Sequence, residues 1–210
     1  MSASFLSKLA KALQEELPGE KAQLKMANAF RQTRPSKDTT VLTASVSLLL
    51  YQKKEDWYFP LIQRTATNPN DRHGGQISFP GGKQEEADNH LRDTAFREAE
   101  EEIGVSKKDI ELVGALTPLY IPVSNFMVHP FVGYLPYSPQ FKKQETEVAE
   151  VLEIKLSALN NQDNIRRKDI KLSQGIRLKD VPYFYLHEKT VWGATAMILS
   201  EWQAILKQIK

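Results

Sequence analysis

The apolar residues at the start of the chain follow a helical repeat. Five of them recur at the spacing of one face of an amphipathic helix: Phe5, Leu6, Leu9, Leu13 and Leu17. Pro18 and Gly19 end this pattern, and a weaker helical stretch over residues 21–30 ends before Arg34 and Pro35. We therefore expect residues 1–36 to form an N-terminal helical extension and residues 37–210 to form the main domain.

From residue 41 the pattern changes to short runs rich in Val, Ile, Leu and Thr, which is typical of strands. Residues 41–51 and 57–62, joined by a polar stretch, predict a hairpin. Further strands are predicted at residues 110–116, 127–134, 148–154 and 181–186. A second hairpin is predicted over residues 168–178, turning at residues 173–175.

Two longer helices complete the prediction. One covers residues 90–103 and ends at Gly104, a residue suited to a helix C-cap. The other covers residues 191–209 and directs Ile198, Trp202 and Ile205 inward. The polar loop over residues 64–75 contains Pro, Asn and Gly and is expected to contact substrate. The sequence thus predicts one domain with mixed α and β elements.

Composition narrows the class of protein. The chain has 210 residues, 41% of them hydrophobic and 26% charged, and these values fit one globular domain. It contains no cysteine, which excludes disulfides and thiolate metal sites. A net charge of +2 gives no reason to expect nucleic acid as a partner. The start of the chain does not resemble a signal peptide, and no apolar run is long enough to span a membrane. We expect a cytoplasmic protein with a small-molecule substrate. A homodimer is an open possibility.

The strongest chemical signal is an acidic segment over residues 81–105, which holds eight acidic and three basic residues. On a helix, Glu98, Glu101 and Glu102 share one face, whereas Phe96, Ala99 and Ile103 share another. Three carboxylates on one face favour a hard divalent cation such as Mg²⁺ or Mn²⁺ over zinc.

Neighbouring residues support this interpretation. Arg97 precedes Glu101 by four residues and can hold its carboxylate in place. A backbone carbonyl at Gly81 or Gly82 can add a ligand, because glycine lets the backbone approach closely. The alternative is an ordinary solvated acidic face. The Gly-Gly turn ahead of the acidic helix favours the metal site instead.

The same residues carry a family resemblance. Gly82, Asp88 and the run Arg-Glu-Ala-Glu-Glu-Glu-Ile-Gly-Val over residues 97–105 resemble the signature of the Nudix hydrolases. Asp88 stands where that family usually has Glu, and one extra residue separates it from Arg97. The resemblance implies an α/β fold, a Nudix-type α/β/α sandwich with a mixed central sheet, to which this chain adds the N-terminal helix. It also implies metal ligands at Glu98, Glu101, Glu102 and the Gly81 carbonyl, with Arg97 orienting a helix carboxylate.

Two further stretches resemble the coenzyme A pyrophosphatase branch of that family. Residues 75–82 read Gly-Gln-Ile-Ser-Phe-Pro-Gly-Gly and follow Leu-Ile-Gln-Arg at residues 61–64. Residues 181–184 and 191–196 are similar to that branch as well. The resemblance implies hydrolysis of coenzyme A to 3′,5′-ADP and 4′-phosphopantetheine. It implies substrate contacts at Arg64, Arg72, Gly75, Phe79 and Gly82.

Several alternatives stay open from the sequence. The general base is Glu98 or a carboxylate from outside the helix, for which Glu147 and Glu150 are candidates. The 3′-phosphate of coenzyme A would meet Arg64, Arg72, His73 or the basic residues within 166–177, although these last also fit an ordinary solvated hairpin. Rival substrates are ADP-ribose, NADH and diadenosine polyphosphates. A non-catalytic nucleotide sensor is the alternative outside the enzyme class.

Overall fold

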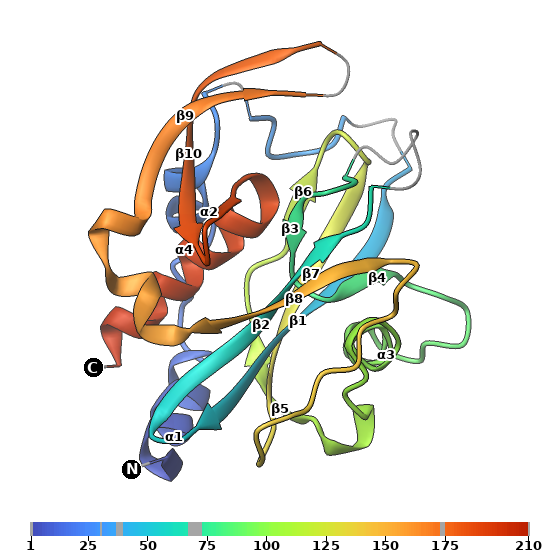
Figure 1. The fold of residues 1–210 in the computed structure, drawn as a ribbon, viewed down its shortest axis with the longest axis vertical. Coiled ribbons are helices and arrows are strands. Elements are labelled where there is room, and N and C mark those ends of the chain that lie inside the picture. Colours follow the sequence, from blue (N-terminus) through green and yellow to red (C-terminus); the bar gives the residue numbers. More distant parts are fainter. Residues whose placement is uncertain (1, 30, 37–39, 67–72, 173–174, 210) are drawn as a thin grey trace.

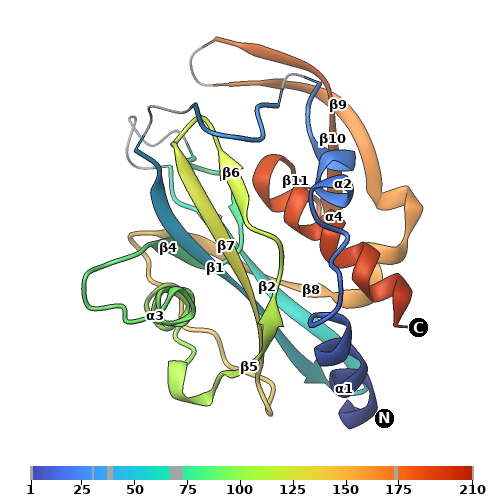
Figure 2. The ribbon, with the colours of Figure 1, turned by 180° about the vertical axis from the view of Figure 1, so that it is seen from behind.

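A mixed central sheet lies between two helical layers. The computed structural model describes residues 2–29, 31–36, 40–66, 73–172 and 175–209. The sheet order is β3-β2-β1-β7-β5, with β4 beside β1, β6 beside β7 and β8 beside β2. Only the β1–β7 pair is parallel among the strand pairs of the described residues. One face packs on α3, and α4 with the N-terminal helices lies on the other face (Figures 1 and 2).

The eight strands of the central sheet are β1 (Leu42–Lys53), β2 (Asp56–Arg64), β3 (Ile77–Ser78), β4 (Gly81–Lys83), β5 (Glu111–Ala115), β6 (Leu119–Ile121), β7 (Phe126–Tyr134) and β8 (Val148–Lys155). A smaller sheet lies beside α4 and contains β9 (Ile165–Lys171), β10 (Arg177–Leu186) and β11 (Lys189–Val191). The α-helices are α1 (Ser2–Ala12), α2 (Gly19–Gln23), α3 (Leu91–Ile103) and α4 (Gly193–Gln208). Short 3-10 turns occupy Leu24–Met26, Lys107–Asp109, Leu156–Asn160 and Gln162–Asn164. The predicted α/β/α sandwich with a mixed sheet is confirmed.

Most predicted elements are found within a few residues of the expected bounds, and two expectations were wrong. Residues 177–186 form one strand, β10, rather than a hairpin arm followed by a separate strand. An irregularity between Leu178 and Val181, where Asp180 has a φ of 50°, bends β10 without ending it. The weaker N-terminal helix is a single turn, α2, that tightens into a 3-10 turn. Of the predicted 173–175 turn, residues 173 and 174 lie outside the described residues.

Helix α3 has the ends and the buried face that its sequence predicts. At its start the Asp93 carboxylate accepts the His90 N–H at 3.0 Å. At its end Gly104 takes a φ of 70°, a left-handed conformation that costs glycine little. Phe96, Ala99 and Ile103 are buried against the sheet. This packing directs another face of α3, which carries Glu98 and Glu102, toward the glycines of β4 and toward Arg64 at the end of β2.

A buried carboxylate ties the N-terminal segment to α4. Glu201 is 0% exposed. It accepts the N–H groups of Gly19 at 3.2 Å and Thr117 at 3.3 Å, the Thr117 hydroxyl at 2.6 Å and the Gln23 amide at 2.9 Å. Leu9 belongs to the same hydrophobic core as α4. The N-terminal segment therefore packs against the rest of the chain, and the domain boundary at residue 36 stays a prediction.

Replacing Glu201 by Gln should destabilise the fold. Both carboxylate oxygens of Glu201 accept hydrogen bonds, and Gln replaces one of them with an NH₂ group that can only donate. One buried N–H or O–H group then loses its acceptor, so we expect a loss of about 1–3 kcal/mol in the free energy of unfolding. Chemical denaturation with circular dichroism would measure it. The exposed Glu86→Gln is the matched control and should leave the midpoint unchanged. An unchanged midpoint for the Glu201 variant would show that this buried network contributes no stability.

Candidate active site

The turn before α3 brings backbone against the acidic helix. A Cβ atom at Gly82 would lie 2.4 Å from Glu98 Oε1, and one at Gly81 would lie 2.3 Å from the Ser45 carbonyl oxygen. Gly81 therefore requires glycine, because a Cβ there would meet backbone and its φ is 155°, whereas a side chain at Gly82 would displace the Glu98 carboxylate. Pairing of β4 with β1, where Gly81 lies opposite Val46, holds this backbone in place. The sequence predicted that the two glycines form a turn. In the structure they are instead the first residues of β4.

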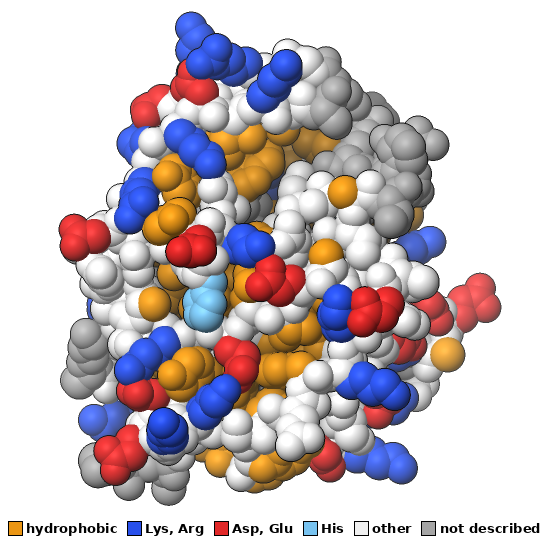
Figure 3. All heavy atoms as spheres, viewed as in Figure 1, with side chains coloured by type: hydrophobic (Ala, Val, Ile, Leu, Met, Phe, Trp, Pro, Cys, Tyr) orange, Lys and Arg blue, Asp and Glu red, His pale blue; other side chains and the backbone are white. Residues whose placement is uncertain are grey.

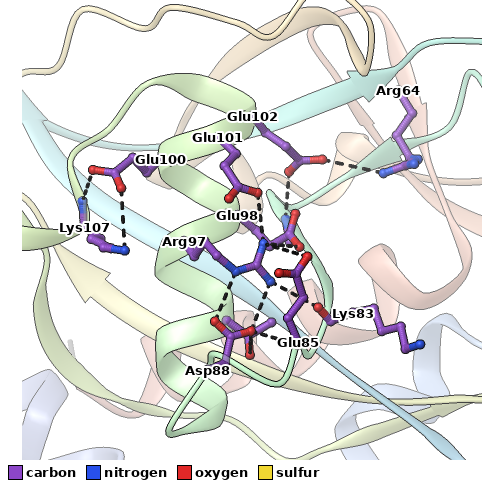
Figure 4. A network of polar contacts seen from close by, with 12 residues as sticks. Arg64, Lys83, Glu85, Asp88, Arg97, Glu98, Glu100, Glu101, Glu102 and Lys107 are labelled. Atoms are coloured by element: carbon purple, nitrogen blue, oxygen red, sulfur yellow. Dashed lines mark hydrogen bonds and ion pairs between the residues drawn. The ribbon is translucent and has the colours of Figure 1, made fainter.

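Arg97 is the centre of the polar network on α3. Its Nη1 donates to Glu98 at 3.0 Å and to Glu101 at 2.9 Å, and its Nη2 donates to the Lys83 carbonyl at 3.2 Å. Its Nε and Nη2 both contact Asp88, each at 3.1 Å. Figure 4 shows the guanidinium enclosed by these acceptors. Arg97 thus fixes the orientation of two helix carboxylates.

The sequence left the role of Asp88 open, because this residue stands where the family usually has Glu. The structure gives it a role in holding Arg97. Its hydrogen bond with Arg97 lowers the pKa of Asp88 to about 2, with help from the Glu85 N–H and the Thr94 hydroxyl. Asp88 therefore anchors Arg97 from the loop. The extra residue between the two is accommodated in the loop before α3. No spacing rule in the sequence identified this contact.

Glu102 is the most buried carboxylate of the network. It is 1% exposed, its Oε2 accepts the Gly81 N–H at 2.8 Å, and its Oε1 lies 3.6 Å from Arg64 Nη1. Burial raises the pKa of Glu102 to about 8, and the negative charges of Glu98 and Glu147 add to this, although Gly81 and Arg64 oppose it. Burial likewise raises the pKa of Glu98. The site therefore concentrates negative charge with too little compensation.

The three helix glutamates share one face as predicted, but they do not converge on one point. Glu101 has 55% of its side chain exposed, Glu98 has 14%, and Arg97 stands between them. Within the described ranges, no three His, Asp or Glu side chains form a group that could hold a metal ion.

Of the two outside carboxylates, the structure brings Glu147 to the site. Its charge acts on both Glu98 and Glu102. Its carbonyl oxygen accepts the Thr65 N–H at 2.9 Å, which fixes this residue beside the end of β2. Glu150 is instead paired with Lys189 at 2.8 Å. Glu147 is therefore the better candidate for an outside base.

The residues predicted to bind substrate have different positions. Arg64 and Gly82 lie at the carboxylate cluster, and the Gly75 N–H donates to the Arg64 carbonyl at 3.1 Å. Phe79 was predicted to contact substrate, but its side chain is 2% exposed and packs beside the Phe59 ring in the core. A substrate cannot reach this side chain. Arg72 lies outside the described residues.

The Gly81 backbone also differs in detail from the prediction. The sequence proposed its carbonyl as a metal ligand, and the structure shows its N–H donating to Glu102. The two interactions involve different atoms of one residue, so the carbonyl ligand stays a prediction. The contact explains how a buried Glu102 is held at the turn.

A carboxylate helix packed on a mixed sheet, with the glycines of β4 against its acidic face, defines the class of protein. Residues 41–174 match the model of the NUDIX domain family. Because the match covers more than half of the chain, this protein belongs to the Nudix family. The match ends before α4 and most of the smaller sheet, so these elements lie outside it.

Relatives and a solved structure agree with this assignment. The chain is 34% identical over 130 residues to an uncharacterized Nudix hydrolase NudL of Pectobacterium atrosepticum, covering 62% of this chain and 66% of the relative, just under two thirds. It is 31% identical over 141 residues to the NudL of Photorhabdus laumondii, covering 67% of this chain and 73% of that one. The MutT protein from Methanosarcina mazei Go1 superimposes with a TM-score of 0.53 at 16% identity, covering 82% of this chain and 99% of that one. That structural likeness shows the fold alone.

The helices add one negative finding. In the part of the chain that the structure describes, none is both long and apolar enough to cross a membrane.

Proposed function

We propose that the protein hydrolyses the pyrophosphate bond of coenzyme A or its derivatives. The observation that supports this best is the group of carboxylates at one sheet edge, where Glu98, Glu102 and Glu147 meet Arg64 and the Gly81 turn. With a divalent cation bound, such a site would suit a substrate with two adjacent phosphates. The choice of coenzyme A rests on the likeness of residues 61–82 and 181–196 to that branch of the family.

The donor set fits a hard divalent cation, Mg²⁺ or Mn²⁺. All of the side-chain donors are carboxylate oxygens, which these ions prefer. Burial raises the pKa of Glu102 to about 8, and a bound cation would favour the ionised form of this carboxylate. Glu98, Glu101 and Glu102, with the Gly81 carbonyl, are the proposed ligands. When bound, the cation supplies charge neutralisation at the phosphoryl oxygens and acidifies water.

The protein's own residues supply binding, orientation and proton transfer. Arg64, which lies 3.6 Å from Glu102, is the proposed phosphate contact. Arg97 orients the carboxylates of Glu98 and Glu101. Glu147 or Glu98 accepts the proton of the attacking water. The water oxygen bonds to phosphorus while the bridging P–O bond breaks, and the bridging oxygen leaves as part of a phosphate monoester. For coenzyme A the products are 3′,5′-ADP and 4′-phosphopantetheine.

One panel of substrates tests the proposal. Phosphate-ester release should be measured with Mg²⁺ and with Mn²⁺ on coenzyme A, ADP-ribose, NADH and a nucleoside triphosphate. The highest kcat/KM on coenzyme A is expected. A higher value on ADP-ribose or NADH would assign a different dinucleotide. Binding without turnover of any compound would favour the non-catalytic sensor.

Recognition of the 3′-phosphate of coenzyme A needs a basic side chain. In the hairpin of β9 and β10, three of the arginines already have partners. Arg167 pairs with Asp180 at 2.8 Å, and Arg177 pairs with Asp169 at 2.9 Å. Arg166 lies over the Tyr185 ring at 4.0 Å. Figure 3 shows basic and acidic side chains interleaved over this face of the molecule. These pairs favour the solvated-hairpin interpretation, so Arg72 and Arg64 are the better candidates.

Removal of the 3′-phosphate should therefore weaken the reaction. Dephospho-coenzyme A is expected to have a lower kcat/KM than coenzyme A, by a factor that corresponds to about 1–3 kcal/mol of transition-state stabilisation, because one charge-assisted contact is lost. Arg72→Ala should lower kcat/KM for coenzyme A and leave the dephospho form unchanged. Equal losses on both substrates would place Arg72 at the shared pyrophosphate. Equal efficiencies of the parent on the two substrates would exclude 3′-phosphate recognition.

A further inference from the structure

A lysine from outside the family match reaches the strands that border the site. Lys189 begins β11 of the smaller sheet. Its Nζ donates to Gln63 Oε1 at 2.9 Å and lies 2.8 Å from Glu150 Oε2. Gln63 lies on β2 and Glu150 on β8, and the two are direct partners in the β2–β8 ladder. One ammonium group therefore joins the smaller sheet to both strands of this pair.

The β2–β8 ladder changes register immediately beyond this contact. Gln63 is opposite Glu150, but the next residue, Arg64, is opposite Val148. Ala149 is thus an extra residue, as in a β-bulge. Bulges bend a strand and redirect its side chains, and they are common beside active sites. The extra residue has its own anchor, because the Ala149 carbonyl accepts the Lys143 ammonium at 2.8 Å.

The bulge sets the position of two groups of the candidate site. Beyond it, Arg64 reaches within 3.6 Å of Glu102. On the partner strand, the Glu147 carbonyl accepts the Thr65 N–H at 2.9 Å, which places Glu147 beside the helix carboxylates. A regular ladder would shift Glu147 by one residue relative to β2 and turn its side chain to the opposite face.

Lys189 acts on this arrangement from the far side of the sheet. Successive residues of a strand point to opposite faces, so Gln63 faces away from Arg64 and away from α3. The lysine is therefore separated from the carboxylate cluster by the sheet itself. An ammonium placed there can hold the strands together, but it does not share the face where Arg64 meets Glu102.

We propose that Lys189 is a positioning residue that holds the bulge between β2 and β8 and thereby sets Arg64 and Glu147 for the reaction. This assignment rests on the proposed function for its effect on turnover, whereas its effect on the strand pair is independent of any substrate. Through Lys189, a strand of the smaller sheet that lies outside the family match contributes to the geometry of the site.

The test compares two lysine variants of the full chain. Lys189→Met removes the ammonium and keeps the stem. Lys155→Met is the matched control, because Lys155 pairs with Asp56 at 2.7 Å across the other end of the β2–β8 pair. Two quantities are measured: the amide hydrogen exchange of Thr65, and kcat and KM on the best substrate of the panel. Thermal unfolding of each variant is recorded alongside.

Lys189→Met should accelerate Thr65 exchange and lower kcat about tenfold with little change in KM, since a displaced catalytic geometry affects the reaction step. Lys189→Arg should restore most of both, and Lys155→Met should change neither. Thr65 exchange equal to the parent would overturn the proposal even if the protein hydrolyses none of the panel. A rise in KM alone would also overturn it, because that result would place Lys189 in contact with substrate. Equal losses of kcat in both Met variants would also overturn it, because they would show that the Lys189 contact only stabilises the fold in general.

Discussion

Glu102→Gln should lower turnover by at least ~100-fold, which corresponds to about 3 kcal/mol in the activation barrier. The substitution keeps the size of the side chain and removes the carboxylate proposed to hold the cation. Glu102 is 1% exposed and lies between the Gly81 turn and Arg64, so no neighbouring carboxylate can take its place. Steady-state kinetics on the best substrate, with the metal varied, would measure the loss. The fold should be retained, because Gln can still accept the Gly81 N–H.

Glu100→Gln is the internal control on the same helix. Figure 4 shows Glu100 on the other side of α3, where its carboxylate lies 3.9 Å from Lys107 Nζ. Its change to Gln should leave kcat within a few-fold of the parent. Comparable losses in both variants would mean that the helix as a whole, rather than its face toward Gly81, matters for activity. A Glu102 variant with nearly full turnover would remove this helix from the site.

The helix and its faces could be predicted because their signals are local. The period of Phe96, Ala99 and Ile103 gives the buried face of α3, and Gly104 gives its end. Helical geometry alone then places Glu98 and Glu102 together on another face. The four-residue spacing also predicted the pairing of Arg97 with Glu101, which the structure shows at 2.9 Å. The partner of Asp88 could not be predicted. It depends on loop conformation, which brings Asp88 to Arg97 across the turn before the helix.

Strand length and long-range pairing limited the rest of the prediction. β3, β4, β6 and β11 have only two or three residues each, too few to show an alternating pattern. The approach of Glu147 to the site depends on a register change between β2 and β8, which are far apart in the sequence. The contact of Lys189 with Gln63 spans 126 positions. None of these features has a signature in a short window of residues.

Arg97→Met should be damaging to both stability and activity. The guanidinium is 13% exposed and contacts Asp88, Glu98 and Glu101. Its removal leaves three acidic side chains together without their shared cation, and we expect the metal-free protein to lose about 3 kcal/mol of unfolding free energy. We expect kcat/KM to fall by roughly 100-fold, because two proposed ligands lose their orientation. Arg92→Met, on the exposed first turn of α3, is the control and should be nearly neutral.

The stability loss in Arg97→Met should depend on pH in a defined direction. Arg97 lowers the pKa of Asp88 from 3.8 to about 2, so the ionised Asp88 stabilises the folded parent above pH 4. This contribution declines as the pH falls from 4 toward 2, because over this range Asp88 binds a proton more readily in the unfolded chain than in the folded protein. The difference in unfolding free energy between parent and variant should therefore be largest above pH 4 and shrink between pH 4 and 2. Urea denaturation with a chelator present, repeated across this range, would measure it. A difference that stays constant with pH would show that Arg97 stabilises the fold through packing of its aliphatic stem rather than through its bond to Asp88.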